Sequence, residues 1–224
     1  RLTEVGQVTN STTIPMTDSI SRRGALLATW LNNLSAQKAQ ITQTIYDIAY
    51  AGFTPVAPVV QRNLRNKIAY MIIIPGNNPA QYSQGIFYTY DAHGNVDTLL
   101  QDYGNSSVTA LRNVMNMNNN RFKKLVYRYD LVSGKVNHVA YQAKQADQFY
   151  HRYSYDAENK LVLVETSADS VYWEKDARYE YYKHGSMART ILGDQQVQGI
   201  DYAYTVQGWM KGITSTSMNP GLDM

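Results

Sequence analysis

The stretch Tyr153-Ser154-Tyr155-Asp156-Ala157-Glu158-Asn159 contains a short motif, Tyr-x-Tyr followed by a turn, that occurs five times in the chain. A unit that recurs every roughly 20 to 40 residues is typical of repeat architectures. The paired tyrosines are Tyr88 and Tyr90, Tyr127 and Tyr129, Tyr153 and Tyr155, Tyr179 and Tyr181, and Tyr202 and Tyr204. Repeated chemistry of this kind favours a surface or a wall over a single catalytic centre.

The spacing of the tyrosines predicts β-strands. Residues two apart in an extended strand share one face of the sheet, so each Tyr-x-Tyr places two phenol rings on the same side. The residue between them is mostly polar or small, as Thr89, Ser154 and Ala203 show. This alternation indicates a strand with one ring-bearing face and one wetter face.

A turn is predicted directly after each tyrosine pair. Asp91, Asp130 and Asp156 end their strands, and Asp favours the first position of a type I turn because its carboxylate accepts backbone N–H groups. Tyr182 and Thr205 replace Asp in the last two copies. Three residues after the Asp position, or four in the second copy, comes a residue that adopts a left-handed backbone conformation with little steric strain. These residues are Gly94, Gly134, Asn159, Gly185 and Gly208. The unit is therefore predicted to be a β-hairpin.

The composition excludes several classes of protein. Lys and Arg number 21 against 18 Asp and Glu, a balance of +3 that does not predict a nucleic-acid partner. The chain has no cysteine, which excludes disulfides and thiolate sites. No apolar run is long enough to predict a membrane span. Nineteen tyrosines against four phenylalanines reflect the repeat.

The sequence predicts two regions. Residues 1–40 are expected to be irregular, with a short helix near residues 22–38 where Leu27, Trp30, Leu31 and Leu34 recur at helical spacing. Residues 41–224 are expected to form one continuous array of hairpins. Tyr46-Asp47 is a candidate degenerate copy, and residues 52–63 are expected to form a connector. We expect the chain to be a segment of a longer polypeptide, because neither end shows a capping unit.

The repeat resembles the YD repeat of the Rhs family, whose relatives include bacterial toxin-complex shells and the animal teneurins. Tyr-x-Tyr-Asp is followed by x-x-Gly and a basic or polar residue, and the stretches 150–159 and 199–209 resemble Rhs proteins of Bacteroidetes-type bacteria. The resemblance covers residues 40–224. It implies a curved, spiralling β-sheet that forms part of a hollow shell.

The resemblance also implies a function. The chain would be a structural shell segment of a large secreted or cell-surface protein that encapsulates or displays a toxin or effector. The implied partners are the remaining Rhs repeats of the same parent protein and an enclosed toxin or a secretion or delivery component. A closed shell takes more repeats than five, so this chain would supply only part of a wall. The family's self-cleaving Asp motif is not matched, since Asp223 is no substitute, so no catalytic residue is carried over.

The remaining candidates for chemistry carry little signal. His93, His138, His151 and His184 are scattered, and His93 and His184 occupy the same turn position, so neither a catalytic nor a metal site is predicted. No cofactor motif is present, and we expect no enzyme activity. An alternative is that Trp173 and Trp209 form stacking platforms of a cell-surface carbohydrate-binding or adhesion module, against the simpler view that these rings pack within the sheet.

Overall fold

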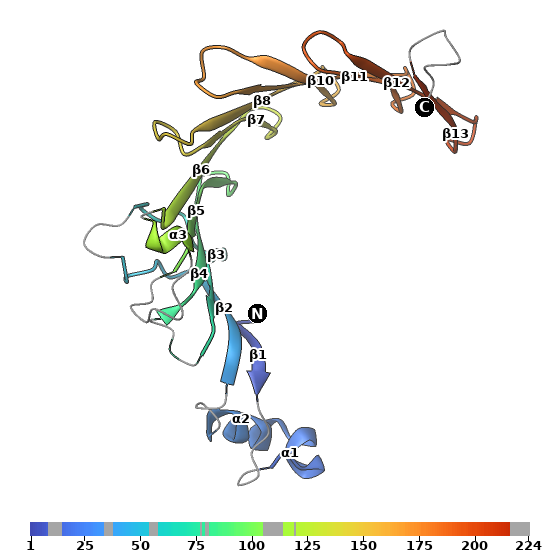
Figure 1. The fold of residues 1–224 in the computed structure, drawn as a ribbon. Coiled ribbons are helices and arrows are strands. Elements are labelled where there is room, and N and C mark those ends of the chain that lie inside the picture. The colour runs from blue at the N-terminus through green and yellow to red at the C-terminus, as the bar shows by residue number, and fades with distance from the viewer. Residues whose placement is uncertain are drawn as a thin grey trace. The chain divides into compact units, whose positions relative to one another are not determined.

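The computed structural model describes residues 1–8, 15–33, 38–53, 58–76, 78, 81–104, 114–118 and 120–215. Within these ranges the chain forms strands β1 to β13 and the short helices α1 to α3 (Figure 1). The strands follow one another in the sheet in chain order, with β1 and β13 at the two ends. The prediction of a mainly β chain built from tandem antiparallel hairpins is confirmed.

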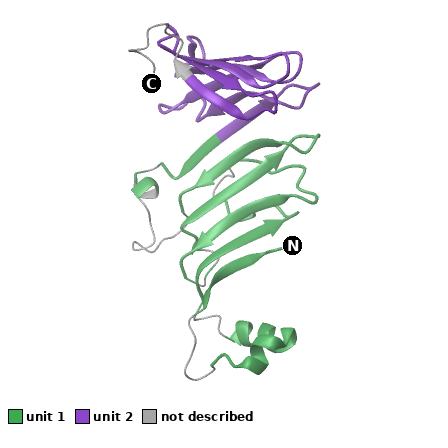
Figure 2. Ribbon diagram, turned by 90° about the vertical axis from the view of Figure 1, so that its right-hand side faces the viewer, with its two compact units in different colours: residues 1–124 green, residues 125–224 purple. Residues whose placement is uncertain are grey.

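The chain divides into two compact units, residues 1–124 and residues 125–224, which we call unit 1 and unit 2 (Figure 2). Unit 1 contains β1 (Glu4–Val8), α1 (Asp18–Arg22), α2 (Gly24–Asn33), β2 (Lys38–Tyr46), β3 (Ile68–Ile74), β4 (Gln84–Tyr90), β5 (Val96–Asp102) and α3 (Val114–Met117). Strand β6 (Phe122–Tyr129) begins in unit 1 and continues into unit 2.

Unit 2 consists of hairpins joined by short turns. Its strands are β7 (Val136–Tyr141), β8 (Phe149–Tyr155), β9 (Leu161–Ser167), β10 (Glu174–Tyr181), β11 (Met187–Leu192), β12 (Gln198–Tyr204) and β13 (Met210–Ser215). The paired tyrosines end strands β4, β6, β8, β10 and β12, and the next strand returns antiparallel.

The predicted helix near residues 22–38 is two shorter helices. Arg23 is extended (φ −116°, ψ 109°) and separates α1 from α2, and strand β2 already begins at Lys38. The side-chain oxygen of Thr17 caps α1 by accepting a hydrogen bond from the Ile20 N–H at 3.4 Å. Trp30 is the buried residue of α2.

A β-bulge recurs at the same place in six hairpins. In each hairpin the pairing register shifts at the last two residues of the first strand, the second of which is a tyrosine. The shifts lie at Ile45/Tyr46, Thr89/Tyr90, Arg128/Tyr129, Ser154/Tyr155, Glu180/Tyr181 and Ala203/Tyr204. The extra residue lies on the returning strand, as Asp97 does in β5 and Val162 in β9, so it is the returning strand that bends opposite the second tyrosine.

Unit 1 has a core on one face of its sheet. Ile72, Phe87 and Leu100 are at most 2% exposed, and Phe53 and Val59 from the connector pack against them. This connector, residues 48–67, joins β2 to β3, and its described residues Phe53 and Val59 pack against this face of the sheet. The predicted connector, residues 52–63, lies within it, and residues 54–57 are outside the described part.

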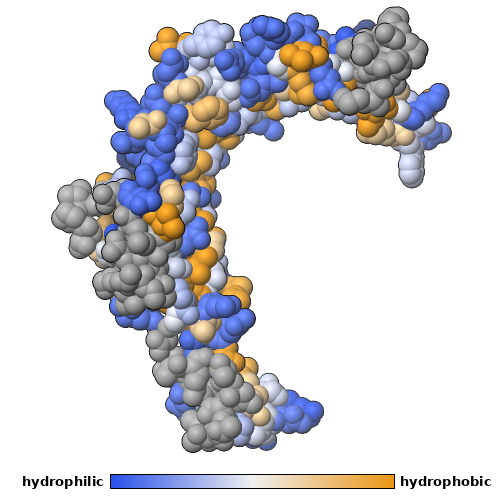
Figure 3. Space-filling view, in the orientation of Figure 1, coloured by the Kyte–Doolittle hydropathy of each residue, from blue (hydrophilic) through white to orange (hydrophobic). Residues whose placement is uncertain are grey.

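The side chains of unit 2 are less buried than the core of unit 1. Its buried apolar residues include Val139, Ala140, Tyr150 and Ala177, which are 7–9% exposed. Figure 3 shows hydrophilic residues over much of the visible surface, with hydrophobic residues in small separate groups. Strand pairing and the contacts between successive hairpins are therefore important for holding this unit together.

Candidate functional site

The turn of the repeat has the same backbone hydrogen bonds in all five copies. In the third copy, Asp156 N–H donates to the Lys160 carbonyl at 2.9 Å and Asn159 N–H donates to the Asp156 carbonyl at 3.0 Å. The residue at the Gly or Asn position has a positive φ in every copy. The φ values are 91° at Gly94, 68° at Gly134, 62° at Asn159, 97° at Gly185 and 83° at Gly208.

The turn carboxylates accept backbone N–H groups. Asp91 Oδ1 accepts from His93 N and Asn95 N, both at 2.9 Å, and Asp130 Oδ2 accepts from Ser133 N at 2.7 Å. In the fifth copy the Thr205 hydroxyl oxygen takes this role and accepts from Trp209 N at 3.1 Å. The Asp is thus a cap for the turn, and a hydroxyl can replace it.

The turn carboxylates predict a loss of stability in acid. The hydrogen bond from the Ser133 N–H lowers the pKa of Asp130 below its ordinary value of 3.8. Burial opposes the hydrogen bonds to Asp91, but its pKa is also lowered. A carboxyl group with a lower pKa in the folded state contributes stability above about pH 4, and this contribution is lost as the pH falls through the folded-state pKa. We expect the urea midpoint to fall between about pH 5 and pH 3, and Asp130→Asn to fall less steeply.

Replacing Gly94 with valine should destabilise its hairpin by about 1–3 kcal/mol, because a β-branched residue at φ +91° is strained. A Cβ there would also approach Lys67 Nζ to 3.0 Å. Gly94→Asn is the control, since Asn159 adopts φ 62° at the equivalent position and the expected cost is under about 1 kcal/mol. Thermal unfolding measures both variants, and equal losses would contradict this account of the turn.

The second tyrosine of the repeat holds the preceding hairpin. At Tyr90, Tyr155 and Tyr181 its hydroxyl donates to the backbone carbonyl of the first residue of the preceding strand, which belongs to another hairpin. Tyr90 bonds Ile68 at 2.9 Å, and Tyr155 and Tyr181 bond Val136 and Leu161 at 2.8 Å. We call this hydrogen bond the tyrosine clamp. Burial raises the pKa of Tyr90, Tyr155 and Tyr181, so these hydroxyls stay protonated as donors at neutral pH.

The clamp lies where the pairing between successive hairpins stops. The β3–β4 ladder reaches Tyr70–Phe87, the β7–β8 ladder reaches His138–Arg152, and the β9–β10 ladder reaches Leu163–Arg178. Beyond these pairs, toward the turn, the tyrosine hydroxyl reaches a carbonyl that the ladder does not pair. Neighbouring hairpins are therefore joined at one end by backbone pairing and at the other by a side chain.

A lysine accompanies the clamps of Tyr90 and Tyr181. Lys67 Nζ lies 5.5 Å from the ring centroid of Tyr90, and Lys160 Nζ lies 5.4 Å from that of Tyr181. Each lysine directly precedes the residue whose carbonyl accepts the clamp. Lys67 Nζ also donates to the Gly94 carbonyl at 3.0 Å, so one turn is tied to the next. In both cases the lysine directly follows an asparagine with a positive φ, Asn66 or Asn159.

Tyr46-Asp47, the candidate degenerate copy, has the geometry of the repeat. Asp47 N–H donates to the Lys67 carbonyl at 3.1 Å, as Asp156 does to Lys160, and Asn66 has a φ of 60°. The Tyr46 hydroxyl donates to the Leu2 carbonyl at 3.3 Å. The connector is therefore an insertion inside the turn of a repeat copy.

The last copy departs from this pattern. The Tyr204 ring makes an edge-to-face contact with Tyr182 at 6.4 Å, and the Tyr182 hydroxyl donates to the Tyr202 carbonyl at 2.9 Å. Tyr182 occupies the position of the missing Asp. Here an aromatic side chain from the turn makes the contact between hairpins.

Replacing Tyr155 with phenylalanine should destabilise unit 2 by about 0.5–1.5 kcal/mol, because it removes the hydrogen bond to Val136 and keeps the ring. Tyr153→Phe is the matched control in the same strand. The Tyr153 ring stacks on His151 at a centroid distance of 6.3 Å, and this contact survives the change. Urea unfolding of both variants compares them, and a larger effect at Tyr153 would contradict the role of the clamp.

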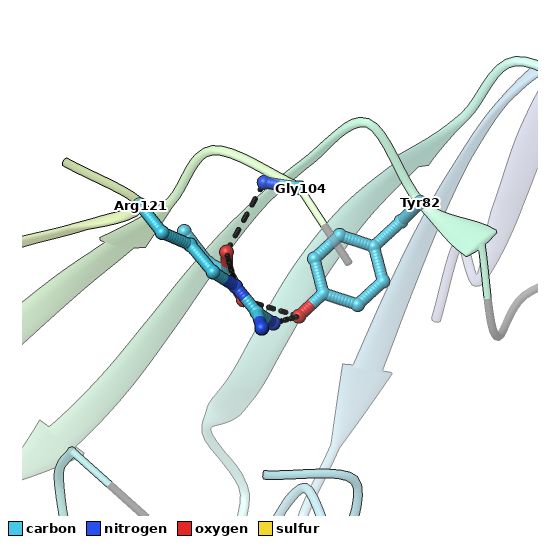
Figure 4. Close-up of polar contacts among 4 residues, drawn as sticks. Tyr82, Gly104 and Arg121 are labelled. Carbon is cyan, nitrogen blue, oxygen red and sulfur yellow. Dashed lines mark hydrogen bonds and ion pairs between the residues drawn. The ribbon is translucent and has the colours of Figure 1, made fainter. Parts of the chain in front are cut away.

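A buried polar cluster in unit 1 joins Asp102, at the end of β5, to Arg121, which directly precedes β6 (Figure 4). Asp102, which is 0% exposed, accepts from Arg121 Nε and Nη2, both at 2.8 Å. It also accepts from the Gly104 N–H at 3.1 Å and from the Tyr82 hydroxyl. The hydrogen bonds to Asp102 raise the pKa of Arg121, and burial raises the pKa of Tyr82. The carboxylate is fully paired, so the cluster acts as a structural tie that sequence reasoning missed.

His93 and His184 lie in turns, whereas His138 in β7 and His151 in β8 lie on paired strands. His138 is partly buried, and burial first, then Arg128 and Arg152, lowers its pKa. His151 and His184 stack on Tyr153 and Tyr182. Across the part of the chain that the structure describes, no three His, Asp or Glu side chains are grouped to hold a metal ion. No helix in those ranges is long and apolar enough to cross a membrane.

The two tryptophans proposed as stacking platforms differ in environment. The Arg152 guanidinium carbon lies 4.3 Å from the ring centroid of Trp173, and His138 contacts the same ring at 6.0 Å. Trp209, in the last turn, is 75% exposed. Only Trp209 therefore presents most of its surface to the solvent.

No family model matches the chain, and neither does any curated protein. The crystal structures of TcdB2-TccC3-Cdc42 and TcdB2-TccC3-TEV are similar over 81% and 80% of the chain, with 12% and 11% identity and TM-scores of 0.46 and 0.49. A structure of the Tc holotoxin pore of Photorhabdus luminescens is similar over 82%, with 11% identity and a TM-score of 0.36. The match covers 10–11% of these structures' own chains, and at these scores the likeness carries no inference about function.

Proposed function

We propose that this chain is a segment of the structural wall of a large secreted or cell-surface Rhs-repeat protein. The wall encloses or displays a toxin or effector part of the parent protein, and this segment has no catalysis of its own. Its partners are the remaining repeats of the same protein. The repeat itself, described above, supports this reading.

The observation that carries the proposal is the repeated contact between hairpins. Each clamp joins one hairpin to the one before it, and the same carbonyl position accepts it in β3, β7 and β9. Units that contact only their neighbours can be added one after another, and their stability is a sum over units and interfaces. Such a sheet grows in one direction without needing a central core, which suits a wall.

The chemistry of the described side chains is consistent with a wall. The Asp102 carboxylate is saturated by Arg121, Gly104 and Tyr82, and the turn carboxylates cap backbone N–H groups. These acidic groups hold strands and turns in place. Their hydrogen bonds stabilise the sheet that the proposal requires.

Limited proteolysis of the full-length polypeptide tests the enclosure. The proposal expects the toxin or effector part to resist protease while the repeat region is folded, and to be cut once urea unfolds that region. A matched sample of the isolated effector part gives the unprotected rate. Equal rates in the two samples would contradict enclosure.

Binding of a carbohydrate is a second candidate function, which the 75% exposure of Trp209 favours. Exposed aromatic rings are suitable anchors for a ligand. Glycan-array binding that is lost in Trp209→Ala and kept in Trp173→Ala would support it. Binding that does not exceed background in the unmodified chain would count against it.

A further inference from the structure

Unit 1 shows what fills the gap between two hairpins beyond the end of their ladder. The connector residues Gln61, Arg62 and Asn63 lie between β3 and β4 on the turn side of the Tyr70–Phe87 pair. Their bonds to the strands combine side chain and backbone. Gln61 Nε2 donates to the Ala69 and Tyr88 carbonyls at 2.6 and 2.9 Å. The Arg62 backbone makes two bonds: its N–H donates to Thr89 Oγ1 at 3.1 Å, and its carbonyl accepts from the Tyr90 N–H at 3.2 Å. Asn63 Nδ2 donates to the Tyr90 carbonyl at 2.8 Å.

Unit 2 contains the equivalent gap between β9 and β10. The clamp from Tyr181 to Leu161 matches the clamp from Tyr90 to Ile68, which aligns the two pairs of strands residue by residue. Under this alignment Val162 corresponds to Ala69, Tyr179 to Tyr88, and Glu180 to Thr89. In unit 1 the connector bonds the carbonyls of Ala69 and Tyr88 and the side chain of Thr89.

A pocket of about 420 Å³ opens at this gap. Its lining includes Val162, Leu163, Tyr179 and Glu180, which are the equivalents of residues that meet the connector or lie beside it in unit 1. Ser154 and Ile191 extend the lining onto the neighbouring strands. The volume lies within the range of pockets that hold small ligands or a few residues of a peptide.

The charges at this pocket are balanced. Lys175 and Arg178 contribute two positive charges, and Glu180 and Asp194 contribute two negative ones. Arg178 Nη2 lies 3.5 Å from Glu180 Oε1, with both side chains well exposed, so this weak pair can rearrange. The balanced charges select for neither sign of charge, so hydrogen-bonding amides of a bound segment would make the specific contacts.

We propose that the pocket between β9 and β10 docks an extended segment of a partner polypeptide that carries a glutamine in the role of Gln61. The glutamine amide donates to the Val162 and Tyr179 carbonyls. The next backbone N–H donates to the Glu180 carboxylate, which replaces Thr89 Oγ1, and the next carbonyl accepts from the Tyr181 N–H. Such binding adds main-chain hydrogen bonds at a gap between strands, and the amide side chain gives specificity. The inference concerns one pocket of unit 2 and does not depend on the wall proposed above.

The test uses the full chain and a synthetic peptide of residues 58–66, Pro-Val-Val-Gln-Arg-Asn-Leu-Arg-Asn, as the probe. Titration is followed by the NMR shifts of backbone amides. We expect saturable shifts at Tyr181 and Glu180. A peptide with Gln61→Leu should bind at least about tenfold more weakly, because leucine keeps the size and lacks the donor.

A variant of the chain locates the binding site. Ser154→Phe places a ring in the pocket and should weaken peptide binding by at least about tenfold. Ala203→Phe is the matched control, since Ala203 holds the same position of the repeat in β12 and does not line this pocket. Circular dichroism confirms that both variants fold.

Two results would overturn the proposal. One is an absence of saturable shifts at Tyr181 and Glu180 up to millimolar peptide. The other is binding that Ser154→Phe leaves unchanged, which would mean that the peptide exchanges with its own counterpart in unit 1. Loss of binding in Ser154→Phe but not in Ala203→Phe supports the proposal even if the enclosure tested by proteolysis fails.

Discussion

Replacing Arg121 with alanine is expected to destabilise unit 1 by about 3–5 kcal/mol, because the change leaves a buried carboxylate without its cation. Asp102 is 0% exposed and Arg121 contacts it through two nitrogens, so water cannot readily replace the guanidinium. The Arg121 side chain is itself only 25% exposed, which limits solvent screening of the pair. Urea-dependent hydrogen exchange of the β4 and β5 amides measures the free energy of opening.

Two further variants separate the charge from the packing. Arg121→Lys keeps the positive charge and loses the two parallel hydrogen bonds, so we expect it to recover only part of the stability. Arg178→Ala is the exposed control, because Arg178 and Glu180 are 60% and 43% exposed and such pairs contribute about 0–1 kcal/mol. Similar losses in Arg121→Ala and Arg178→Ala would show that the buried cluster is not a structural tie.

Replacing Phe87 with alanine is expected to cost unit 1 about 3–5 kcal/mol, because it removes a fully buried ring from the centre of the core. Phe87 is 0% exposed, and its ring lies within 4.8 to 6.2 Å of the rings of Phe53, Tyr50, Tyr70 and Tyr82. The loss includes the cavity that remains after truncation, since the neighbouring rings relax only in part.

Phe149→Ala is the matched control for this substitution. Phe149 is also a strand residue, the first of β8, but it is 39% exposed. Its ring therefore buries less apolar surface, and its removal should cost less stability. Thermal unfolding of both variants gives the comparison. A loss at Phe149 as large as the loss at Phe87 would contradict the assignment of the core to the covered face of unit 1.

The sequence predicted the hairpins because their signals are local. Tyr-x-Tyr alternation defines a strand, and a residue such as Asn159 with φ 62° closes the turn within four residues of it. The degenerate copy at Tyr46-Asp47 was recognisable for the same reason. The helix near residues 22–38 was placed less well, because nothing in the apolar spacing shows that Arg23 leaves the helical conformation.

The contacts between hairpins could not be predicted from the sequence. The clamp from Tyr155 depends on a ladder that stops at His138–Arg152, which is set by the pairing between β7 and β8. Asp102 and Arg121 are separated by 19 positions and by an insertion, so neither residue stands out in the sequence. The partner of a buried charge is decided by the path of the chain, which local patterns do not encode.

Electron microscopy of the full-length polypeptide tests the central claim, that the repeated hairpins build an enclosing wall. The account predicts a particle with an internal cavity, bounded by a sheet in which the Tyr155 and Tyr181 hydroxyls contact the Val136 and Leu161 carbonyls of the preceding hairpins. A compact, solid particle without an internal cavity would contradict it.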